Sequence, residues 1–156
     1  MAAGRNKASK AIVLIVLHLF LSVGAVIGGL GMLISPSGQL IGLSLELLAH
    51  SPFSNYLLPG LLLTLVLGVM PLLVAVGLIR RTPSRIAERF NLYRDMHWAW
   101  TFSLYTGYAL VIWIAAQVYF LQAVHAVHLL YWTLGFAIQI LTLLPRTRSR
   151  YARSSS

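Results

Sequence analysis

The sequence predicts an all-α membrane protein with four transmembrane helices, both termini inside, a short interfacial helix outside and a basic interfacial helix inside. Three observations predict this fold. Of 156 residues, 58% are hydrophobic and only 10% charged, where a soluble domain has about 25% charged residues. The mean hydropathy is +0.80. All 12 Lys and Arg fall in segments that separate long apolar runs. We expect a single four-helix domain over residues 1–156.

Two apolar runs are each long enough to cross the ~30 Å hydrocarbon core, which takes about 20 helical residues. A third uncharged block runs from Trp98 to Leu144. As one helix of about 47 residues it would be ~70 Å long, so we expect it to turn back once, near Gln122. The first run is longer than the apolar core of a signal peptide and no A-x-A site follows it, so we expect it to be retained. The predicted spans are 11–34, 57–79, 98–120 and 125–144.

The basic residues predict how the chain lies in its membrane. They precede span 1, separate spans 2 and 3, and follow span 4, whereas the loops 35–56 and 120–124 contain none. Because cytoplasmic loops are enriched in Lys and Arg, the basic side is predicted to be inside. The segment 145–156 is basic without apolar periodicity, and we expect it to be disordered.

The two longer loops are each predicted to hold an interfacial helix. On the outer side, residues 40–50 place Glu46 and His50 on one face of a helix and leucines on the other. On the inner side, Thr82 is the predicted N-cap of a helix with Pro83 at its first position. The inner loop also carries the arginines expected to contact anionic lipid headgroups, namely Arg80, Arg81, Arg85, Arg89 and Arg94. Its acidic residues, Glu88 and Asp95, are expected to pair locally with them.

Small residues predict where helices approach one another. Span 1 contains a GxxxG pattern and a second small-xxx-small pair, and span 3 has a similar position. The packing residues predicted from these patterns are Gly24, Gly28, Gly29 and Gly107. Sequence leaves open whether they pack within the chain or between copies. Pro71 inside span 2 removes a backbone hydrogen bond, which predicts a kink of that helix near Leu67.

Catalytic motifs are missing from the sequence. The absence of Cys excludes thiol chemistry, and there is neither an HExxH nor a GxSxG motif. All three acidic residues fall in loops, which disfavours a transporter that uses a buried carboxylate. We therefore expect no catalytic residues and no cofactor.

Five histidines are the remaining candidates for chemistry. His18 within span 1 and His97 before span 3 are candidate haem or quinone ligands, against the common alternative of an interhelical hydrogen bond. Glu46, His50, His125 and His128 are all predicted at the outer surface, where they form a candidate metal site. The alternative is that these four groups only anchor the interface.

Uncharged polar residues in the spans suggest either a polar path or hydrogen bonds across helices. They are Gln117, Gln122, Gln139, Thr101, Thr106, Thr133 and Thr142. Most aromatic residues cluster near span ends, as in an interfacial belt. Trp113 is the exception, and packing is its only explanation from sequence.

The outer loop ISPSGQLIGLSLELLAHSPFSNYLLPG (34–60) resembles a segment of small four-helix bacterial integral membrane proteins. In that family P-S-G, a leucine-rich helix and S-P-F-x-x-Y-L-x-P-G precede an apolar helix. The likeness covers about a third of the chain well, implies the four-span layout, and brings no activity with it.

From these patterns we expect a non-catalytic protein of the bacterial cytoplasmic membrane, acting as an accessory, packing or lipid-interacting subunit. One alternative is a homo-oligomeric permease or channel with a path lined by Gln and Thr. A further alternative is a haem- or metal-binding redox protein. The expected partners are anionic lipid headgroups and either further copies of the chain or a larger membrane complex. Nucleic acid is not expected, because the cations flank apolar spans.

Overall fold

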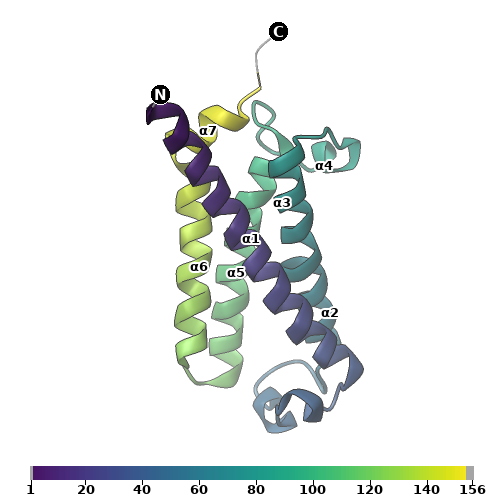
Figure 1. The fold of residues 1–156 in the computed structure, drawn as a ribbon. Coiled ribbons are helices and arrows are strands. Elements are labelled where there is room, and N and C mark those ends of the chain that lie inside the picture. The colour runs from purple at the N-terminus through teal and green to yellow at the C-terminus, as the bar shows by residue number, and fades with distance from the viewer. Residues whose placement is uncertain (1, 154–156) are drawn as a thin grey trace.

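A computed structural model describes the backbone of residues 2–153 and the side chains from residue 11 onward, and its main feature is a bundle of four long helices (Figure 1). The first is α1 (Ala2–Ile34), and the second is a composite of α2 (Leu57–Leu62), η3 (Leu63–Val69) and α3 (Met70–Arg80). The third and fourth are α5 (Trp98–Leu121) and α6 (Ala126–Leu143). Four stretches are long and apolar enough to cross a membrane: Ala11–Ile34, Leu57–Arg80, Trp98–Leu121 and Ala126–Leu143. The predicted all-α class is confirmed for the described residues, with four helices long and apolar enough to cross a membrane.

The two ends of the bundle differ in character (Figure 1). One end, called the terminal end below, holds the start of α1, the short helices α4 (Arg85–Arg89) and α7 (Pro145–Tyr151), and all the segments with Lys or Arg. The opposite end, called the loop end, holds residues 35–56 and the turn between α5 and α6. That turn lies where predicted, because α5 ends before Gln122, which adopts a left-handed conformation with φ 51°.

Glycines allow the helices to approach closely within the chain. A Cβ atom added at Gly29 would meet Thr64 Oγ1 and would lie 2.9 Å from the carbonyl oxygen of Gly60. A Cβ atom added at Gly107 would lie 3.1 Å from the Gly135 carbonyl oxygen, and one added at Gly24 would meet the Tyr131 hydroxyl. Gly28, by contrast, would make only an ordinary contact of 3.6 Å with Leu63. Three of the four predicted packing glycines therefore form tight contacts inside the bundle.

The helical register of the second span changes next to Pro71. Residues Leu63–Val69 form a π-helical segment, in which the Met70 N–H donates to the Leu65 carbonyl five residues earlier. Pro71 follows in the first turn of α3. Proline has no N–H group to donate to the preceding turn. Because the π-helical segment ends just before α3, the missing hydrogen bond falls where two helical segments meet. This π-helical segment includes Leu67, the position near which the kink was predicted.

The loop at the opposite end is not the single interfacial helix that we predicted. It contains two 3-10 turns, η1 (Gln39–Ile41) and η2 (Leu45–Leu48), separated by Gly42 with φ 69° and Ser44 in an extended conformation. A left-handed glycine and an extended residue divide the predicted helix into two short turns. The second turn holds Glu46 but ends at Leu48, before His50, so these two residues do not share a continuous helical face.

The inner-loop helix is shorter than predicted and begins elsewhere. Its N-cap is Ser84, whose Oγ accepts a hydrogen bond from the Ala87 N–H at 3.3 Å. Thr82 was the wrong choice because Pro83 precedes the helix and is not its first residue. The exposed fractions of Ile86 and Phe90 are 78% and 64%, so this helix carries apolar side chains outward.

The predicted disordered tail, 145–156, is instead ordered in its described part. Helix α7 occupies Pro145–Tyr151, and Tyr151 is only 2% exposed. Its hydroxyl donates to the Leu78 carbonyl at 3.0 Å, which ties the tail to the end of span 2. A buried aromatic side chain at the end of a basic segment is what the tail prediction overlooked. Residues 154–156 lie outside the described residues.

The inner loop and the tail are also joined by ion pairs. Arg153 pairs with Glu88, and Arg148 lies 3.6 Å from Asp95. The predicted partners were arginines of the inner loop itself, so the expected local pairing is wrong. The acidic residues instead connect the inner loop to the C-terminal segment.

Candidate functional site

A cavity of about 500 Å³ lies at the loop end, between the loop and the helix ends. The loop contributes Leu43, Leu47 and Phe53, and α5 contributes Trp113 and Phe120. Its volume is within the range of small-molecule sites. No Lys, Arg, Asp or Glu is among its lining residues. Leucines predicted to face lipid acyl chains therefore form one wall of an apolar chamber, called the outer cavity below.

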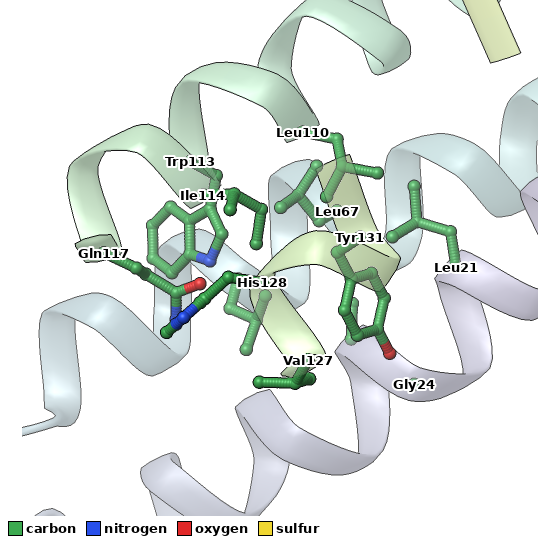
Figure 2. A pocket seen from close by; sticks show the side chains of 12 residues that line it. Leu21, Gly24, Leu67, Leu110, Trp113, Ile114, Gln117, Val127, His128 and Tyr131 are labelled. Carbon is green, nitrogen blue, oxygen red and sulfur yellow. The ribbon is translucent and has the colours of Figure 1, made fainter. Parts of the chain in front are cut away.

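A second cavity, the inner chamber, has a volume of about 160 Å³ and lies deeper among the helices (Figure 2). It shares four lining residues with the outer cavity: Trp113, Gln117, Val127 and His128. In Figure 2 the indole, the amide and the imidazole gather on one side, and Tyr131 forms the opposite side. The two cavities therefore meet at a shared polar wall.

One face of α5 supplies most of the polar wall and the adjoining apolar surface. Trp113, Ala116, Gln117 and Phe120 have the spacing i, i+3, i+4 and i+7, which places them on the same side of a helix. The neighbouring Ala115 is exposed and lines neither cavity. The face of α5 toward the cavities is thus distinct from its outward face.

Hydrogen bonding differs among the four tryptophans. The indole N–H groups of Trp98, Trp100 and Trp132 each donate to a backbone carbonyl. The Trp113 indole N–H and the Gln117 amide make no such bond within the described part of the chain, and both line the two cavities. They are therefore free to bind a guest molecule.

His128 has a defined tautomer because of its neighbour. Its Nδ1 accepts a hydrogen bond from the backbone N–H of His125 at 2.9 Å. A neutral imidazole carries one proton, so the proton is on Nε2, which is then a donor. His128 is buried at the start of α6, while His125 is exposed.

The loop that covers the outer cavity is anchored by Tyr56. Its hydroxyl donates to the Ser44 carbonyl at 2.6 Å, and its backbone N–H donates to the Pro36 carbonyl at 2.8 Å. The side chain is buried, and burial raises the pKa of the phenol. Tyr56 thus fastens the loop in place above the cavity.

The candidate metal ligands are not assembled. The rings of His125 and His128 are 5.5 Å apart. Among the described residues, however, no three His, Asp or Glu side chains are close enough to hold one metal ion. Glu46 and His50 are exposed on the loop, away from the helical register that would have paired them. The sequence-predicted cluster therefore divides into two histidines on the cavity wall and two exposed loop residues.

His18 and His97 occupy different settings. His18 is completely buried in α1, and its Nδ1 lies 2.9 Å from the Leu14 carbonyl of the same helix. His97 is the N-cap of α5, where its Nδ1 accepts from the Ala99 N–H at 3.2 Å. Burial lowers the pKa of His97. Neither side chain lines either of the two cavities.

Most side chains suggested for a polar path make hydrogen bonds within the protein, some inside one helix and others between segments. Thr101 donates to Asn91 at 2.6 Å, and Thr142 lies 2.7 Å from Ser103. Thr106 donates to its own helix, to the carbonyl of Phe102. Thr133 does the same with Leu129, and Gln122 donates to Tyr119. Gln139 packs against Gly107, which leaves Gln117 as the member of this set on a cavity wall.

The predicted headgroup arginines are all exposed. Arg81 also lies over the Tyr151 ring, 5.1 Å from its centroid, and therefore helps to hold the tail. The other four, Arg80, Arg85, Arg89 and Arg94, are exposed at the surface of the terminal end.

Sequence reasoning missed the cavities themselves. Trp113 and Gln117 were considered separately, as a packing aromatic and a general polar residue. Their i, i+4 spacing could have indicated a site, because it places two hydrogen-bond donors on one helix face. The small side chain of Ala116 leaves space on the same face.

No family model matches the chain, and no curated protein or solved structure has significant similarity to it. The resemblance of the outer loop to small bacterial membrane proteins therefore stays a prediction.

Proposed function

We propose that this protein is a non-catalytic, multi-pass membrane protein that binds an apolar, lipid-like molecule in its outer cavity. The observation that carries this proposal is a partly open cavity of about 500 Å³ whose lining residues are mostly apolar and include no Lys, Arg, Asp or Glu. Burial of apolar surface stabilises such a complex by about 25 cal/mol per Å². Of the functions expected from sequence, lipid interaction is the one that this geometry favours.

The proposed orientation places the terminal end in the cytoplasm of a bacterial cell and the loop end outside. Support comes from the distribution of Lys and Arg, all of which belong to segments at the terminal end. The outer cavity then receives its ligand from the outer leaflet of the cytoplasmic membrane.

Anionic headgroups are the proposed partners of the terminal end. Helix α4 exposes Ile86 and Phe90 beside Arg85 and Arg89. Apolar side chains next to arginines suit a helix that lies in the interface, with each cation contributing about 1 kcal/mol. This surface would fix the bundle relative to the inner leaflet.

Extraction of the purified protein with organic solvent tests the proposed ligand. Ala116→Trp should fill the outer cavity, because Ala116 lines it. Ala115→Trp is the matched control, since the adjacent residue is exposed and lines neither cavity. Mass spectrometry of the extracts should show an apolar molecule that copurifies with the wild type and with Ala115→Trp, and is depleted several-fold in Ala116→Trp. Equal amounts in all three proteins would contradict the proposal.

A further inference from the structure

We propose that the inner chamber receives the head of the ligand, and that this head is a single neutral ring bearing carbonyl oxygens, as in a benzoquinone with an apolar tail. The inference rests on the proposed function and specifies the ligand of the same site. The tail would lie in the outer cavity and the head would lie deeper, against Trp113, Gln117 and His128.

The size of the inner chamber limits the head. A cavity of about 150 Å³ in a protein core holds one benzene molecule. The inner chamber, at about 160 Å³, has space for one ring of that size. The Trp113 indole on the wall offers an aromatic surface to a planar ring.

The polar groups on the wall determine the chemistry of the head. The Trp113 N–H can only donate, and His128 donates through Nε2 because its Nδ1 is occupied by the His125 N–H. The Gln117 amide contributes further donors and one acceptor. A wall dominated by donors is complementary to a ligand with acceptor oxygens. Carbonyl groups on a ring provide such acceptors without requiring a donor in return.

The absence of charge on the lining residues excludes an anionic head. Neither cavity has a Lys or Arg among its lining residues. An ionised phosphate or carboxylate without a cation would lose its hydration without compensation, which is strongly unfavourable in an apolar environment. A neutral carbonyl loses far less on entering, and the wall donors replace its water hydrogen bonds.

The orientation follows from where the donors lie. They are at the junction of the two cavities, whereas Leu43, Leu47 and Phe53 surround the space nearer the loop. An apolar tail directed inward would leave the donors of Trp113 and Gln117 without partners while removing them from water, which is unfavourable. Insertion with the head first satisfies them.

The test compares three probes by calorimetric titration of the detergent-purified full chain. They are a benzoquinone with a medium-length alkyl chain, the alkylbenzene of the same chain length, and the methyl ester of a fatty acid of similar length. The quinone should bind at least about tenfold more tightly than the alkylbenzene, because one satisfied hydrogen bond corresponds to about that factor.

Variants assign this difference to the wall. Gln117→Leu should weaken quinone binding about tenfold and leave alkylbenzene binding unchanged. Gln139→Leu is the matched control, because it makes the same change within a span but outside both cavities. Trp113→Phe provides a second variant that keeps an aromatic ring and removes the N–H donor, should Gln117→Leu fail to fold.

Each other outcome overturns a defined part of the account. Equal affinity for quinone and alkylbenzene, or no effect of Gln117→Leu and Trp113→Phe, would refute the assignment of the head to the inner chamber. Equal affinity for the ester and the quinone would refute the ring. Failure of the wild type to bind any of the three probes would refute the proposed function itself.

Discussion

Replacement of Gly29 by alanine tests the helix packing at its tightest point. The added Cβ atom would lie 2.9 Å from the carbonyl oxygen of Gly60 and 3.0 Å from the backbone nitrogen of Thr64, and would also meet Thr64 Oγ1. Backbone atoms cannot move aside without shifting the helix, and the Thr64 hydroxyl is held by its 2.8 Å hydrogen bond to the Gly60 carbonyl. Overpacking of this kind costs about 1–3 kcal/mol.

Gly28→Ala is the internal control for this prediction. Its Cβ atom would make one ordinary contact of 3.6 Å with Leu63. Both variants gain the same helix propensity of up to about 1 kcal/mol, so the difference between them isolates the clash. At roughly 2–4 °C per kcal/mol for a chain of this size, Gly29→Ala should melt about 2–12 °C below Gly28→Ala in detergent. Equal melting temperatures would refute the close approach of spans 1 and 2.

Three further predictions concern the terminal end and the orientation. Tyr151→Phe should lower the free energy of unfolding by about 1 kcal/mol, because the buried hydrogen bond to the Leu78 carbonyl is lost. The control is Tyr108→Phe at an exposed position, which should have no such effect in the same thermal melt. Equal losses of stability in the two variants would mean that the tail is not anchored by this bond. Because burial lowers the pKa of His97 below its usual 6.5, the unfolded chain takes up the proton first, so the contribution of His97 to stability should fall as the pH drops below about 6.5. His97→Asn keeps an N-cap residue and should reduce the loss of melting temperature between pH 8 and pH 5; an unchanged pH dependence would exclude His97 as its source. On intact cells an impermeant thiol reagent should label Ser54→Cys and spare Ser149→Cys, and the reverse pattern would invert the proposed orientation.

The spans were predictable from sequence because the bilayer imposes length and apolarity directly. The ends of the four apolar helical stretches agree with the predicted spans to within about two residues, although α1 itself begins earlier, at Ala2. Even the turn near Gln122 was found without Gly or Pro, since a block of about 47 uncharged residues is too long for one crossing. Hydropathy is a property of single residues in sequence, and it therefore needs no knowledge of tertiary contacts.

The segments at the two ends were predicted less well, because tertiary contacts determine their structure. Tyr151 orders the tail through a hydrogen bond to Leu78, which is distant in sequence. The loop at the other end takes its shape from Tyr56, whose hydroxyl holds the Ser44 carbonyl, and from Gly42 in a left-handed conformation. Helical periodicity cannot indicate either effect.

The candidate site was predictable only in part. His125 and His128 were selected correctly as neighbours, but as metal ligands, whereas the structure places His128 on the cavity wall with one nitrogen already occupied. The cavity depends on how far the loop stands from the helix ends, and no residue pattern encodes that distance. Gln117 and Trp113 gained their significance only once this space was known.

Photolabelling tests most directly whether a lipid-like molecule occupies the cavity. A photoreactive alkyl benzoquinone would be added to the protein in membranes, and the labelled residues would be mapped by mass spectrometry. Cavity binding predicts label on Trp113, Ala116 and Phe120 of α5, competed by excess unlabelled quinone. Label restricted to Ile112 and Tyr119, which are both 67% exposed on the outward face of the same helix, would show that the molecule only touches the bundle from the bilayer and would contradict the account.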